Sequence, residues 1–241
     1  MKRIIGLILI FSLILSSSIF SQISAESILK EVGDKWGSAK DIQMKLSITL
    51  YSYSSKGESI PQKMTMEMFY ITNPLILRIN FLEPALFSGQ IILIDSEKKL
   101  MRVYIPATKQ ILESEFTQTL TYTSGINLPF ISGKEEDFNL EVAELIEKNE
   151  KFYKIIGKPN TPELKTQMSY FELYLNKSEL KPIRLKIFDI YNRLYMDMLW
   201  TELKINQNLS ATKLRTLPQG KIIKQKEPQN ITPIPFFSPG K

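Results

Sequence analysis

The 241-residue chain contains no histidine and no cysteine, which restricts the chemistry its side chains could perform. These absences remove the usual general base, the Ser-His-Asp triad, the thiolate nucleophile and the common zinc ligands. Carboxylates are present, but on a polar strand face they are more often solvated side chains than an acid–base pair. No glycine-rich phosphate loop occurs. We therefore expect neither enzymatic activity nor a cofactor.

One acidic cluster, Glu135-Glu136-Asp137, could attract a cation. Calcium loops supply several oxygen ligands at defined spacing, and no such spacing follows this cluster. We interpret the cluster as a charged loop tip and expect no metal site.

A stripe of methionines favours binding of an apolar ligand over catalysis. Met64, Met66 and Met68 alternate along one predicted strand and so share one face. Methionine is flexible and polarizable, which suits surfaces that adapt to varied apolar partners. The same stripe would equally well fill an ordinary core, and both interpretations stay open here. The candidate lining residues of an apolar cavity are Met44, Leu46, Ile48, Leu50, Met64, Met66, Met68, Leu77, Ile79 and Phe81.

A helix is predicted over residues 26–40, ahead of all the strands. Its apolar residues fall on one face at helical spacing. Two glycines within it, Gly33 and Gly37, each weaken it by up to about 1 kcal/mol. We expect the helix to persist by packing its apolar face on a sheet. That face comprises Ile28, Leu29, Val32 and Trp36.

From Met44 onward the apolar period changes from helical spacing to strict alternation, which indicates strands. Asn73-Pro74 and Glu83-Pro84 are turn signals between them. A sheet of this length rarely stays flat and open, so we expect it to close, or half-close around the helix. The predicted strands are 44–51, 63–70, 75–82, 90–94, 100–105, 110–115, 140–146, 152–157, 167–175, 183–189, 193–205 and 213–217, with a loop over 116–137.

The N-terminus has the pattern of a secretory signal peptide, with Lys2 and Arg3 ahead of the apolar run 4–15 and a small residue at Ala25. The run is short for a membrane span, although a retained anchor is an alternative. We predict a signal peptide over 1–25, one domain over 26–220 and a Pro-rich, extended or disordered tail over 221–241. The formal charge of +6 is spread along the chain without blocks, so nucleic acid is not an expected partner.

Several short motifs follow one another along the predicted domain. They are Ile28-Leu29-Lys30-Glu31-Val32 with Trp36, Asn73-Pro74-Leu75, Phe81-Leu82-Glu83-Pro84, Ile92-Leu93-Ile94-Asp95, Tyr104-Ile105-Pro106 and Leu217-Pro218-Gln219-Gly220. In this order and spacing they resemble the periplasmic outer-membrane lipoprotein carrier and sorting proteins, the LolA-like family.

The resemblance implies a mainly β fold: an unclosed antiparallel β-barrel, or half-barrel, capped by the N-terminal helix as a lid. It also implies a monomeric periplasmic carrier that binds acyl chains of lipoproteins or lipids in an apolar cavity and transfers them towards the outer membrane. The implied partners are an inner-membrane ABC transporter and an outer-membrane receptor. The alternative is an envelope-stress sensor or regulatory binding module on the same fold.

One position departs from the family pattern. Carriers of this family keep an arginine directly before the proline that corresponds to Pro74, and it helps to hold the lid closed. Asn73 occupies that position here, and the nearest arginines that follow in the sequence are Arg78 and Arg102.

Overall fold

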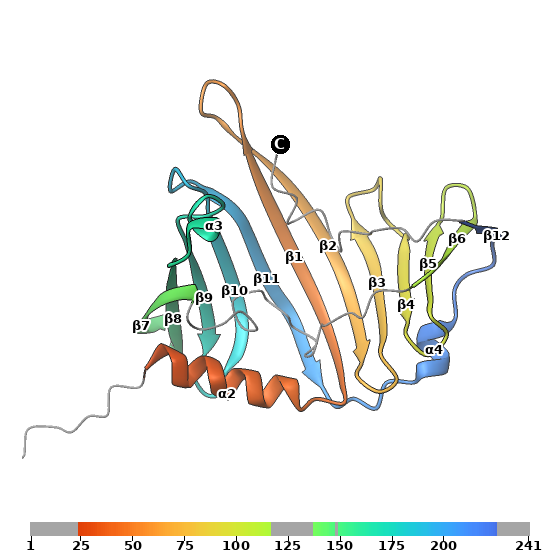
Figure 1. Ribbon diagram of the computed structural model, residues 1–241, viewed down its shortest axis with the longest axis horizontal. Coiled ribbons are helices and arrows are strands. Elements are labelled where there is room, and N and C mark those ends of the chain that lie inside the picture. The colour runs from red at the N-terminus through yellow and green to blue at the C-terminus, as the bar shows by residue number, and fades with distance from the viewer. Residues whose placement is uncertain (1–23, 117–136, 148, 226–241) are drawn as a thin grey trace, which may run out of the picture.

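The computed structural model describes residues 24–116, 137–147 and 149–225 (Figure 1). Most of the predicted signal peptide, the Glu135-Glu136 pair and the tail from residue 226 lie outside the described residues. Twelve strands form one sheet. They are β1 (Asp41–Tyr53), β2 (Ser59–Ile71), β3 (Ile76–Glu83), β4 (Ile91–Asp95), β5 (Leu100–Ile105), β6 (Gln110–Glu115), β7 (Phe138–Glu147), β8 (Glu150–Pro159), β9 (Tyr170–Asn176), β10 (Lys181–Phe188), β11 (Leu194–Ile205) and β12 (Lys221–Lys224).

The sheet is unclosed, with β7 at one edge and β12 at the other. Its strand order is β12-β6-β5-β4-β3-β2-β1-β11-β10-β9-β8-β7. Neighbouring strands are antiparallel except β12 and β6, which pair in parallel. This confirms the prediction of a mainly β, unclosed antiparallel sheet with an N-terminal helix.

Helix α2 (Ala25–Gly37) lies along one end of the sheet, beside strands β7 to β11 (Figure 1). The Ser24 hydroxyl accepts a hydrogen bond from the Ser27 amide and caps its first turn. The helix ends three residues earlier than predicted because Ser38 caps it and the chain then turns into β1. Its buried side chains include the four that helical spacing predicted, Ile28, Leu29, Val32 and Trp36.

Because side chains alternate along each strand, the sheet has two faces, and a different helix packs on each. We call the face that packs on α2 the inner face; it carries Leu46, Met66 and Phe81. The opposite, outer face carries a second, smaller apolar cluster around Ile76 and Leu93.

Helix α4 (Ala211–Arg215) packs on the outer face and corrects the strand predicted over 213–217. A short strand was predicted there, but the Ser210 hydroxyl accepts a hydrogen bond from the Lys213 amide and starts a helical turn. Leu214 is buried against Ile76 and Leu93. The last strand, β12, follows Gly220, where the predicted tail begins. The sheet therefore extends four residues past the predicted end of the domain.

A third short helix, α3 (Pro162–Lys165), precedes β9. The strand predicted over 167–175 therefore begins later, at Tyr170. None of the helices in the described part of the chain is long and apolar enough to cross a membrane.

Candidate functional site

The residues predicted to line an apolar cavity all lie on the inner face of β1, β2 and β3. Cross-strand pairing sets them in rows: Leu46 lies opposite Met66 of β2, and Met66 lies opposite Phe81 of β3. All belong to one apolar cluster with the buried side chains of α2. The ten are Met44, Leu46, Ile48, Leu50, Met64, Met66, Met68, Leu77, Ile79 and Phe81.

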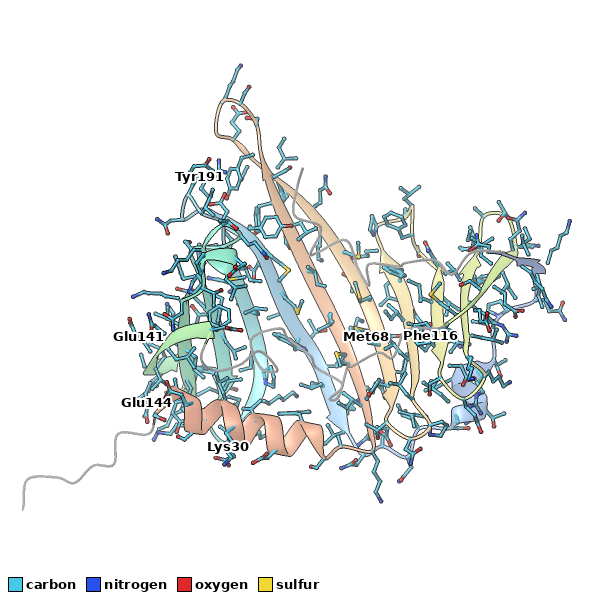
Figure 2. The ribbon with its side chains drawn as sticks, viewed as in Figure 1. Lys30, Met68, Phe116, Glu141, Glu144 and Tyr191 are labelled. Carbon is cyan, nitrogen blue, oxygen red and sulfur yellow. The ribbon has the colours of Figure 1, made fainter. Side chains whose placement is uncertain are left out.

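The cluster is unevenly covered. On β8, β9 and β10, whose ends meet α2, residues such as Ile155, Leu173 and Leu185 have no exposed area. On β2 and β3, Met68 and Phe81 are only partly buried. Figure 2 shows Met68 on the span of sheet beyond α2, whereas Lys30 points from the helix away from the sheet. The apolar inner face therefore extends past the part that α2 covers.

Most of the partly buried residues of the cluster lie on five neighbouring strands, and the others are Leu75, Leu164 and, on β7, Leu140 and Val142. The eight on the five strands are Leu50 on β1, Met64 and Met68 on β2, Leu77 and Phe81 on β3, Ile92 on β4, and Met198 and Ile205 on β11. Three of these eight are methionines, whose side chains can change rotamer with little loss of contact. This span of the inner face therefore combines flexible methionines with partly buried aliphatic and aromatic side chains.

At the end of the sheet opposite α2, the apolar surface reaches solvent. The Phe81 ring contacts the Phe87 ring of the β3–β4 loop, with centroids 6.3 Å apart. Beside it, Leu86 is 84% exposed. The β3–β4 loop, at the end of the sheet opposite α2 (Figure 1), thus joins exposed apolar side chains to Phe81 of the inner face.

The predicted lid helix is attached near its C-terminal end. The Trp36 indole N–H donates to the backbone carbonyl oxygen of Leu180, in the β9–β10 turn, at 3.3 Å. The Lys35 ammonium donates to the carbonyl oxygen of Glu179 in the same turn. Helical spacing identified Trp36, but neither acceptor could be identified, because both lie more than a hundred residues away in the sequence.

Neither nearby arginine contacts the lid in the described residues. Asn73 is exposed in the β2–β3 turn. The Arg78 guanidinium lies on the outer face and donates to the carbonyl oxygens of Leu214 and Thr216, at 3.0 and 2.6 Å. Burial lowers the pKa of Arg78. Arg102 pairs with Glu113 on the same face, at 2.7 Å.

Ion pairs gather on the outer face. Lys154 contacts Glu172 at 2.6 Å, and Arg184 contacts Asp197 at 2.5 Å. Burial alone would raise the pKa of the Glu172 carboxyl, but bonds from the Lys154 ammonium and the Tyr174 hydroxyl hold that pKa below its usual range. Residues 24–116, 137–147 and 149–225 contain no group of three or more His, Cys, Asp or Glu side chains that could hold a metal ion.

The Arg215–Asp95 pair holds α4 against β4. Asp95 accepts from Arg215 Nε at 2.7 Å and from the Lys98 amide at 3.2 Å. Burial would raise the pKa of the Asp95 carboxyl, but these donors together lower it below its ordinary value. This ion pair therefore lies on the outer face, opposite the candidate site.

No protein-family model matches the sequence, and no curated protein matches it. An uncharacterized conserved protein from Thermus thermophilus is similar in structure, with 17% identity, a TM-score of 0.54, and coverage of 83% of this chain and 99% of that chain. MucB is similar at 12% identity and a TM-score of 0.50, over 83% of this chain and 65% of MucB.

A LolA superfamily protein from Nitrosomonas europaea aligns over 80% of this chain and 98% of its own, at 14% identity and a TM-score of 0.36. The structural neighbours are LolA-superfamily and MucB proteins. At these identities the likeness concerns the fold, and this chain spans less than two thirds of MucB. In the fold of this chain, the candidate site is the inner face between α2 and the β3–β4 loop.

Proposed function

We propose that this protein is an exported periplasmic carrier that binds acyl chains of lipoproteins or lipids on its inner face and transfers them towards the outer membrane. The observation that carries the proposal is the uneven covering of one continuous apolar cluster. Over β8 to β10 its side chains are closed under α2, whereas over β1 to β3 buried side chains such as Met66 lie beside partly buried ones such as Met68 and Phe81.

The free energy of exposing an acyl chain to water favours a site that encloses the chain over one that leaves it on an open surface. Burial of each methylene contributes about 0.8 kcal/mol, so exposing a chain of about 16 carbons to water costs on the order of 12 kcal/mol. A carrier must replace water along most of the chain. The apolar rows from β11 to β3 offer contacts of that kind, and α2 acts as the lid that completes them.

The proposed role also specifies where the protein works and which partners it meets. It is exported by the signal peptide predicted over 1–25, works as a monomer without a cofactor and catalyses no reaction. Cargo arrives from an inner-membrane ABC transporter and leaves to an outer-membrane receptor. The domain that does this comprises residues 26–220 and the strand at Lys221–Lys224.

Acyl-chain binding is tested with the purified mature protein, by native mass spectrometry for bound lipid and by uptake of a fluorescent acyl chain. The test variant is Met68→Glu, because Met68 is partly buried and a charge there opposes an apolar ligand without filling the closed core. Ser47→Glu is the matched control: it adds the same charge on the outer face of β1. Uptake should fall at least about tenfold in Met68→Glu and persist in Ser47→Glu.

Two results would count against the proposal. If the wild-type protein neither carries lipid nor takes up the probe, acyl-chain carriage is wrong. If folded Met68→Glu takes up the probe normally, the methionine stripe is not part of the site.

A regulatory binding module is the second candidate. One neighbour, MucB, has been solved in complex with MucA. A protein partner for this chain would give a stoichiometric complex that survives size-exclusion chromatography of envelope extracts. Such a complex, found together with no acyl uptake, favours the regulatory function.

A further inference from the structure

Trp200 of β11 contributes an unpaired hydrogen-bond donor to the inner face. Its side chain belongs to the apolar cluster and is 5% exposed. The indole Nε1 atom is fully buried and finds no acceptor among the described residues. The other tryptophan, Trp36, is also buried, but its Nε1 is bonded to the Leu180 carbonyl oxygen.

An unpaired buried indole N–H is uncommon. Roughly nine in ten buried polar groups in folded proteins have a hydrogen-bond partner. An indole N–H can only donate, so the group that satisfies Trp200 must be an acceptor. On the β1 side its neighbours across the strands offer none, because they are the apolar side chains of Leu46 and, one strand further, Met66.

Trp200 also lies where a bound acyl chain would pass. The row Trp200, Leu46, Met66 and Phe81 crosses four neighbouring strands on the inner face. Phe81 is partly buried and contacts Phe87 of the β3–β4 loop. Leu46 and Met66 of this row are themselves buried, so a ligand that enters from the loop reaches the indole N–H by displacing side chains, and those along the row are all apolar.

We propose that the Trp200 indole N–H donates a hydrogen bond to the acyl carbonyl oxygen of the ligand. This inference rests on the proposed function and narrows its substrate class to acylated lipids, in which the chain is attached through an ester or amide carbonyl. Alkyl ethers and plain hydrocarbons leave the donor unpaired. A free carboxylate would place an uncompensated charge in the apolar cluster, which disfavours ionised fatty acids.

A matched pair of ligands isolates the carbonyl. Palmitoyl-lysophosphatidylcholine and hexadecyl-lysophosphatidylcholine share a head group and chain length and differ in ester against ether attachment. The wild-type protein should bind the ester about fivefold to tenfold more tightly, as expected for one buried hydrogen bond. Trp200→Phe should remove this preference and keep the ether affinity. Trp36→Phe removes the other indole; because it loosens the lid it should weaken the binding of both ligands alike and so keep the preference for the ester. A palmitoyl-amide peptide tests whether an amide carbonyl serves equally.

A second measurement does not depend on the folding of Trp200→Phe. In Trp36→Phe, Trp200 is the only indole left, because the chain has two tryptophans. Its indole resonance in a ¹⁵N–¹H correlation spectrum should move downfield with the ester and not with the ether. Equal affinities for the two ligands, or equal resonance shifts, would overturn the carbonyl contact and leave acyl-chain carriage standing. Binding of neither ligand would refute both proposals.

Discussion

The Trp36 indole N–H and the backbone carbonyl oxygen of Leu180 form a buried hydrogen bond of 3.3 Å between α2 and the β9–β10 turn. This bond joins the lid to the closed half of the core, so the helix is attached to the sheet through its C-terminal end. Trp36 is 6% exposed, and its ring adds apolar contact to the same attachment.

Trp36→Phe should loosen the lid. It removes the donor, leaves the Leu180 carbonyl oxygen unpaired and costs about 1–3 kcal/mol locally. Amide hydrogen exchange in α2 should accelerate, and a bound fluorescent acyl chain should dissociate faster. Lys30→Ala on the solvent side of α2 is the control and should leave both rates unchanged (Figure 2). Unaltered exchange in Trp36→Phe would show that the bond does not hold the helix.

Gly157→Ala should destabilise the closed half of the core. A Cβ at this position would lie 2.1 Å from Cε1 of Phe171, which is 1% exposed and also meets the Phe138 ring edge-on. Overpacking of this kind typically costs about 1–3 kcal/mol. Urea unfolding monitored by circular dichroism measures the loss. A midpoint equal to that of the wild type would mean that Phe171 can move aside freely.

Gly33→Ala should have the opposite effect. Gly33 lies inside α2, and a Cβ there would meet no atom within 4 Å. Alanine favours a helix over glycine by up to about 1 kcal/mol. The urea midpoint should therefore rise, and acyl-chain release should slow if α2 opens to let cargo leave. A lower midpoint would show that the helix needs the freedom of glycine at this position.

Asp95→Asn should destabilise the protein at neutral pH and change its response to acid. The pKa of the Asp95 carboxyl is lowered in the folded protein, so its contribution to stability is full above the unfolded value of about 3.9. That contribution is lost as the pH falls through the folded-state pKa, which lies below about 3.9. The free energy of unfolding of the variant should fall short of wild type by about 2 kcal/mol at neutral pH. This gap should narrow below about pH 4. A constant gap across the acid range would contradict the assignment.

Arg78→Met should release α4 without affecting acyl-chain uptake. The substitution leaves the carbonyl oxygens of Leu214 and Thr216 without their charged donor and costs about 2 kcal/mol. Hydrogen exchange in α4 and β12 should accelerate. Uptake of the fluorescent probe should persist because Arg78 lies on the outer face. Loss of uptake would assign this arginine a role at the site after all.

Much of the inner face was predictable because alternation fixes which side chains share a face. The positions of Met64, Met66 and Met68 on one side of β2 follow from a period of two, whatever the rest of the sheet does. The same holds for α2, whose buried residues follow from helical spacing. Such local patterns are specified within one element.

The features that sequence reasoning missed depend on distant parts of the chain. The segment 213–217 was predicted as a short strand, but the Ser210 cap together with the burial of Leu214 against Ile76 and Leu93 makes residues 211–215 a helix. Lys221–Lys224 looked like tail because its parallel partner, β6, lies about a hundred residues earlier in the sequence. The unpaired Trp200 donor has no sequence signal, since only coordinates show whether an indole finds an acceptor.

The pairing of β1 with β11 has a consequence for how the chain acquires its structure. Strands β1 to β6 are consecutive neighbours, as are β7 to β11, so each group can assemble from contacts close in sequence. The seam between the groups joins residues such as Leu46 and Trp200, more than 150 positions apart. Closing such a long loop is slow. During folding β1 therefore waits with one unpaired edge, and a chaperone that shields this edge would raise the yield of folded protein.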